Sequence, residues 1–113
     1  MSKDNGGPAR DRELLEMAAK AAGITSVGYG RNGIATGRNG PCLIGYWNPL
    51  TDDGDALRLA VKLGISIECI AAHDTVMAHI DNEHSSTSAT EAMDDFGTRH
   101  AIVRAAAAIG SAM

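Results

Sequence analysis

A cluster of carboxylates, Asp52, Asp53 and Asp55, follows the dipeptide Asn48-Pro49 and is the densest group of metal-binding side chains in the chain. Carboxylate oxygens are the ligands that Mg²⁺ and Ca²⁺ prefer, but these ions take about six oxygens, and no second acidic cluster nearby supplies the rest. Acidic side chains also satisfy the free N–H groups at the start of a helix. We therefore expect the cluster to begin a helix and to hold no metal.

Three histidines, His73, His79 and His84, occur within a twelve-residue stretch. The first two are six residues apart and would share one face of a strand. A zinc site needs three or four convergent ligands, and no third ligand of matching geometry is evident. We therefore expect surface histidines. His100, next to Arg99, is likewise expected to face solvent.

Nucleophilic catalysis needs a Ser or Cys beside a base and an oxyanion donor. The serines between positions 85 and 88 lie in a polar stretch without a nucleophile motif, and Cys69 is separated from His73 by an expected turn. The sequence therefore favours a protein that is not an enzyme and has no cofactor.

Two copies of Gly-Arg-Asn-Gly, at 30–33 and 37–40, give the best candidate for ligand recognition. Asn-Gly favours tight hairpin turns, so Arg31 and Arg38 are expected at two loop tips. They lie in residues 21–50, which contain two bases and no acid. Arginines on loops bind carboxylates and phosphates, although they also simply keep an apolar hairpin in solution.

The spacing Gly28-x-Gly30-x-x-Gly33 matches the dinucleotide-binding pattern. That pattern requires its glycines to open a helix after a strand. Here they lead into an Asn-Gly turn, so we expect no dinucleotide site.

Tyr46 and Trp47 form the only aromatic concentration. A Trp at a strand-to-helix corner is usually a core anchor, whereas an exposed Trp is a typical hot spot for a protein partner. The candidate binding residues thus come from two loops, one aromatic pair and one acidic turn: Arg31, Arg38, Tyr46, Trp47, Asp52 and Asp53.

Composition limits the classes of partner. The 113 residues are 44% apolar but only 4% aromatic, with a net charge of −4. No dense Lys/Arg patch is present, so direct nucleic-acid binding is not expected. No apolar run approaches the ~20 residues of a membrane span, and no signal peptide is recognisable, so we expect a cytoplasmic protein. Its two cysteines, Cys42 and Cys69, are expected to be buried, reduced thiols.

The segments that must position these residues follow from periodicity and capping signals. Residues 1–9 are expected to be a flexible tail and 10–113 a single domain. A first helix should bury Leu14, Met17, Ala18 and Ala21 and end at Gly23-Ile24. A short meander of three strands follows, its middle strand about four residues long.

A second helix, capped by Thr51 or Asp52 with Asp55 in a capping box, should bury a face that ends at Gly64-Ile65. That face consists of Ala56, Leu59, Ala60 and Leu63. Strands are expected at 65–72 and 75–80 and a surface loop at 81–90.

A last helix at about 94–109 should bury Ile102, Ala105, Ala106 and Ile109, and Gly110 should close it. The order α-β-β-β-α-β-β-α predicts an α+β layered sandwich with one antiparallel sheet of about five strands.

Three segments resemble proteins of tailed phages and prophages: residues 47–60, the run 99–107, and Arg12-Glu13-Leu14-Leu15. They are similar to what is called the phage α-β-α sandwich domain. The resemblance implies a phage accessory protein in the cytoplasm of an infected bacterial host and supports the sandwich fold, but it carries no catalytic residue across.

We expect a non-enzymatic module that binds a host or phage protein complex, with inhibition of an antiviral defence, of the anti-CRISPR kind or a similar one, as one role that fits. The alternative is a protein that sequesters a small nucleotide, with Arg31 and Arg38 on phosphate and Trp47 or Tyr29 stacking on the base. A small hydrolase acting through residues 73–84 ranks third.

Overall fold

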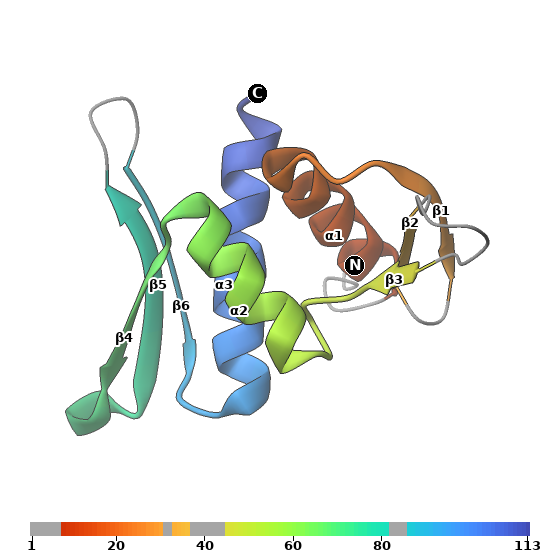
Figure 1. Ribbon diagram of the computed structural model, residues 1–113. Coiled ribbons are helices and arrows are strands. Elements are labelled where there is room, and N and C mark those ends of the chain that lie inside the picture. The colour runs from red at the N-terminus through yellow and green to blue at the C-terminus, as the bar shows by residue number, and fades with distance from the viewer. Residues whose placement is uncertain (1–7, 31–32, 37–44, 82–85) are drawn as a thin grey trace.

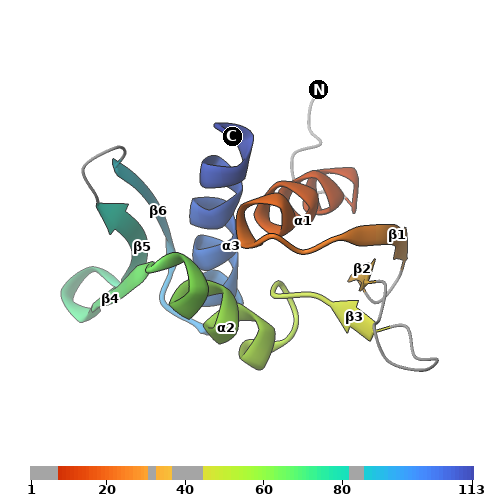
Figure 2. The ribbon, with the colours of Figure 1, turned by 45° about the horizontal axis from the view of Figure 1, so that its top comes forward.

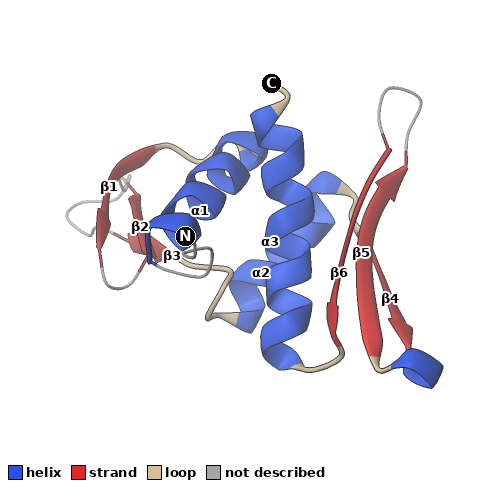
Figure 3. Ribbon diagram, turned by 180° about the vertical axis from the view of Figure 1, so that it is seen from behind, coloured by secondary structure: helices blue, strands red, loops and turns tan. Residues whose placement is uncertain are grey.

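The structure, a computed structural model, describes residues 8–30, 33–36, 45–81 and 86–113. Its three helices lie between two antiparallel three-stranded sheets (Figure 1). The view from behind shows the same sequence of layers, with a sheet on either side of the helices (Figure 3). The predicted α+β class is therefore confirmed, but the prediction of one sheet of about five strands is wrong.

The first sheet is the predicted meander, β1 (Ser26–Gly30), β2 (Gly33–Thr36) and β3 (Gly45–Trp47), in that order. Its middle strand has four residues, as expected. Ile34 in β2 is fully buried. Gly30 pairs with Gly33 across the hairpin, so the glycines of the dinucleotide-like pattern connect two strands and open no helix.

The second sheet has the order β4-β5-β6. Strands β4 (Ser66–Ile70) and β5 (Thr75–Asp81) confirm the two predicted strands, with the 3₁₀ turn η1 (Ala71–His73) between them. The predicted loop at 81–90 is wrong, because its second half, 86–90, belongs to β6 (Ser86–Ala92) and Asp81 belongs to β5. This strand is mostly polar in sequence. Ala89 is buried, whereas its neighbours Ser88 and Thr90 are exposed.

The first helix, α1 (Pro8–Ala22), begins within the segment that was expected to be a tail. Its buried residues are Leu15, Ala18, Ala19 and Ala22. The predicted face was therefore one position out of phase, because Leu14 and Met17 are only partly buried and flank the true face.

The second helix, α2 (Asp53–Leu63), lies where it was predicted, with Ala56, Leu59 and Ala60 buried and Leu63 partly buried against the core. Gly64 ends it in the left-handed conformation at φ 71°, and the Ile65 N–H donates to the Ala60 carbonyl at 2.8 Å. Helix α1 ends in the same way at Gly23-Ile24. Both glycine-isoleucine terminators are confirmed.

The third helix, α3 (Asp95–Ser111), lies at the centre of the molecule and contacts α1, α2 and the second sheet (Figure 2). It is therefore buried on most sides and not along one face: Ala101, Val103 and Ala107 are buried as well as Ile102. Gly110 does not close it. A side chain at Gly110 would collide with the main chain of Met17 in α1, so this glycine lets the two helices approach closely.

Candidate functional site

The acidic turn before α2 is held in place by its own side chains. Asp52 is the N-cap of α2, and its Oδ2 accepts a hydrogen bond from the Asp55 N–H at 2.8 Å. The Asp55 carboxylate does not return to Asp52, as a capping box would require, but accepts from the Asn48 N–H at 2.9 Å. The Asn48 side chain in turn accepts from the Leu50 N–H. Two of the three predicted carboxylates thus have structural roles.

Arg99 of α3 joins this turn to the central helix. Its Nε donates to the Leu50 carbonyl at 2.9 Å, and its Nη1 pairs with Asp53 Oδ1 at 2.6 Å. The Arg99 side chain is 18% exposed and that of Asp53 is 79% exposed. Arg99 is therefore committed to these two groups, while most of the Asp53 carboxylate remains open to solvent.

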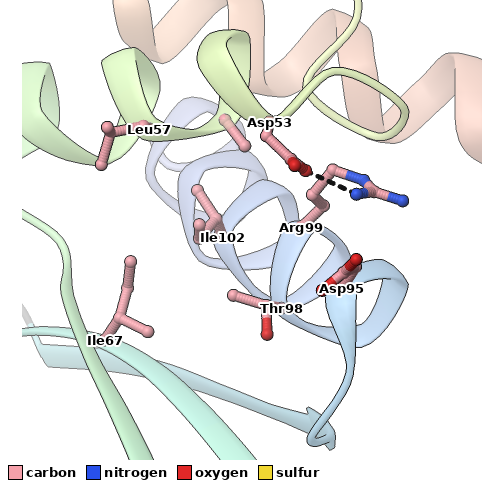
Figure 4. A pocket seen from close by; sticks show the side chains of 8 residues that line it. Asp53, Leu57, Ile67, Asp95, Thr98, Arg99 and Ile102 are labelled. Atoms are coloured by element: carbon pink, nitrogen blue, oxygen red, sulfur yellow. Dashed lines mark hydrogen bonds and ion pairs between the residues drawn. The ribbon is translucent and has the colours of Figure 1, made fainter.

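A groove of about 240 Å³ lies between α2, α3 and β4. Helix α2 contributes Asp53, Ala56 and Leu57, and β4 contributes Ile67. The α3 side is formed by Asp95, Thr98, Arg99 and Ile102. Figure 4 shows Leu57 and Ile67 at one end of this groove and Asp53, Asp95 and Arg99 at the other. We call these the apolar end and the charged end.

The charged end has more acid than base. Asp53 and Asp95 face one arginine, Arg99, which is already paired with Asp53. The neighbouring Asp94 is the N-cap of α3, where its Oδ1 accepts from the Gly97 N–H at 2.6 Å. A ligand that enters this end therefore meets net negative charge and should bring its own cation.

A second polar cluster joins α3 to β6 and was missed from the sequence. His100 Nδ1 lies 2.9 Å from Glu91 Oε2, and Arg104 Nη1 lies 2.6 Å from the same oxygen. The exposed ring of Phe96 stacks on His100 with centroids 5.6 Å apart. His100 is therefore partly buried and paired, and the expectation that it faces solvent is wrong. The sequence did contain a signal for this cluster. Phe96, His100 and Arg104 are spaced four residues apart, which places them on one side of a helix.

The predicted binding residues that the structure describes do not converge on one site. Arg31 and Arg38 lie outside the described residues. Trp47 is only 9% exposed and belongs to the core, so it is the anchor of the strand-to-helix corner. Tyr46 is exposed on β3, in the sheet on the far side of the helices from the groove (Figure 1). Of the four candidates that the structure describes, Asp53 alone lines the groove.

The other candidate chemical groups are also dispersed. His73 ends the turn η1 and His79 lies within β5, so they do not share a strand face, and His84 is outside the described residues. Cys69 is exposed, so the prediction that it is buried is wrong; Cys42 lies outside the described part of the chain. Within the ranges that the structure describes, no three His, Cys, Asp or Glu side chains are grouped so as to hold a metal ion.

None of the helices described is both long and apolar enough to cross a bilayer. In comparisons with known proteins, no family model matches this chain, and no curated protein or solved structure is significantly similar to it.

Proposed function

We propose that this protein is a non-enzymatic module that binds another protein at the charged end of the groove. The observation that carries the proposal is a concave surface with an apolar floor, formed by Ala56 and Ile102, beside two carboxylates, Asp53 and Asp95. Concave apolar surfaces with a few polar groups at the rim are typical binding sites. The fitting partner is a protein that inserts an apolar side chain next to a Lys or Arg.

The charge balance around the groove supports a protein partner over a phosphate ligand. Asp52 and Asp53 are exposed at the start of α2, and Asp95 is exposed at the start of α3. These carboxylates would repel a phosphate but attract a basic protein surface, and they would steer its approach at low ionic strength.

We further propose that the module is a phage accessory protein and that its partner is a host or phage complex, with inhibition of an antiviral defence as the outcome. This part rests on the resemblance of residues 47–60 and 99–107 to small phage proteins.

The alternative, sequestration of a small nucleotide, has less support. Of its two stacking candidates, Trp47 is in the core, and the ring of Tyr29 is covered by the Arg12 guanidinium at 5.4 Å from the ring centroid. Its two phosphate-binding candidates, Arg31 and Arg38, lie outside the described residues. No pocket among the described residues therefore brings together a stacking ring and one of these two arginines for a nucleotide.

The proposal is tested by affinity capture from lysates of candidate bacterial hosts. The double variant Asp53→Asn, Asp95→Asn removes the charge of the groove, and its matched control Glu13→Gln, Asp74→Asn removes the same charge elsewhere. We expect the control to retain the captured protein and the groove variant to lose it, with the largest difference at low salt, because salt screens the charges that the groove variant lacks. Equal capture by both double variants would show that the charged end is not the binding site.

A further inference from the structure

The four edge strands of the two sheets differ in how well they are protected. An open strand edge pairs readily with another chain, and proteins guard against this with bulges, short strands, charges or prolines. In the first sheet, β1 has a register irregularity between Ser26 and Gly28, and β3 has only three residues. In the second sheet, β6 is rich in Ser and Thr.

Strand β4 has only one of these protections within Ser66–Ile70, the single charge of Glu68. Its pairing with β5 is regular over all five residues, and it contains neither proline nor lysine. Ile67, opposite the buried Ala78 and thus on the helix-facing side, is 40% exposed. The side of the sheet that should be covered by helices is therefore open at this edge.

Helix α2 carries a matching uncovered surface. Leu57 is 59% exposed and Val61, one turn further on, is 73% exposed. Leu57 lines the apolar end of the groove together with Ile67. Helix α2 therefore has apolar side chains outside the core. Leu57 and Val61 lie on the side of the helix next to the space that a further strand beside β4 would fill.

We infer that a second copy of this chain fills that space: two β4 strands pair antiparallel about a two-fold axis, and the two second sheets become one continuous sheet. Pairing of identical edges in this way needs an axis perpendicular to the sheet, which keeps the helices of both copies on the same face. Leu57, Val61 and Ile67 of both copies then form one apolar cluster over the axis.

Charge selects the register. With the axis at Glu68, two carboxylates would lie directly opposite each other, which is unfavourable. With the axis one position earlier, Ile67 faces Ile67 and each Glu68 faces the Ser66 hydroxyl of the other copy, which can donate a hydrogen bond. The axis also reverses α2, so the acidic first turn of one copy lies toward the last turn, with Lys62, of the other.

This inference concerns the apolar end of the groove and goes beyond the proposed function, which depends on the charged end. The first readout is the solution mass by sedimentation and light scattering across a wide concentration range. We expect twice the chain mass of 11.7 kDa. The variant Val61→Asp should weaken association by about ten-fold or more, since it buries a charge in the apolar cluster. Tyr46→Asp, at an exposed apolar residue of the other sheet, should leave association unchanged.

Oxidative cross-linking tests the register. In a background with Cys42 and Cys69 replaced by Ser, Ile67→Cys should form a disulfide between copies, because directly opposed residues lie within the Cα separation that a disulfide spans. Glu68→Cys should cross-link far less, since the two introduced thiols are not opposed. A chain that stays monomeric at every concentration, or a dimer that is insensitive to Val61→Asp, would overturn the inference. A monomer that still captures a protein through Asp53 and Asp95 would leave the proposed function intact.

Discussion

Replacement of Gly110 by Ala tests the packing on which the central helix depends. A Cβ at this position would lie 2.8 Å from the Met17 carbonyl carbon and 3.3 Å from the Ala21 nitrogen, and closer still to the Met17 oxygen. These are main-chain atoms of α1, so they cannot rotate away as a side chain could. Helix α1 must move, and overpacking of this kind costs about 3 kcal/mol at the upper end of the usual range.

Helix propensity acts in the opposite direction and sets the net effect. Ala is better than Gly in a helix interior by about 1 kcal/mol. The free energy of unfolding of Gly110→Ala should therefore fall by about 2 kcal/mol, which lowers the Tm by about 8 °C for a domain of this size. Urea unfolding followed by circular dichroism measures it.

The matched control is Ala108→Gly, an exposed position two residues earlier in the same helix. It should cost about 1 kcal/mol from propensity alone. If Gly110→Ala instead raised the stability by about that amount, α1 would not cross α3 at this glycine, and the arrangement of the helices would need revision.

Three further stability predictions follow from single contacts. Leu59→Ala should cost ~2–5 kcal/mol in urea unfolding because the side chain is 2% exposed, and a loss below ~1 kcal/mol would reject the buried face of α2. Asp52→Ala should cost about 1 kcal/mol through loss of the N-cap, whereas Asp52→Ser should stay within ~0.5 kcal/mol of the wild type; equal losses would show that the cap does not stabilise α2. Arg99→Met should lower the free energy of unfolding by about 1–2 kcal/mol, chiefly because the Leu50 carbonyl loses its donor. Asp53→Asn should lower it by less than ~1 kcal/mol because the Asp53 carboxylate is mostly exposed. The reverse order of the two losses in thermal melts would contradict the contacts of Arg99.

The sequence predicted the elements whose signals are local. The N-cap Asp52, the face of α2 and the two Gly-Ile terminators depend on residues a few positions apart, and all are as expected. The three-stranded meander was likewise predictable from its turn residues and short apolar runs.

What the sequence did not predict depends on contacts between distant segments. A polar edge strand such as β6 resembles a loop in sequence, because its helix-facing side combines the small Ala89 with the charged Glu91 instead of a run of large apolar residues. The division of the strands into two sheets is set by which face of the helices each sheet covers, and α3 is buried on several sides because three elements pack on it. No local pattern shows either arrangement.

The candidate site was found only in part for the same reason. Asp53 was identified from the acidic turn, but its partner Arg99 is 46 positions away, and Ile67 reaches the groove from a different element. The Glu91–His100–Arg104 cluster also joins a strand to a helix, so its three members look like ordinary surface charges in the sequence.

The most direct test of the protein-binding role is capture by the tagged wild-type protein from host lysate, read by mass spectrometry for both proteins and small molecules. The account predicts one enriched protein complex that is retained by the Glu13→Gln, Asp74→Asn control and lost by the Asp53→Asn, Asp95→Asn variant. Retention of a nucleotide with no enriched protein would contradict it and would make nucleotide sequestration the function to pursue.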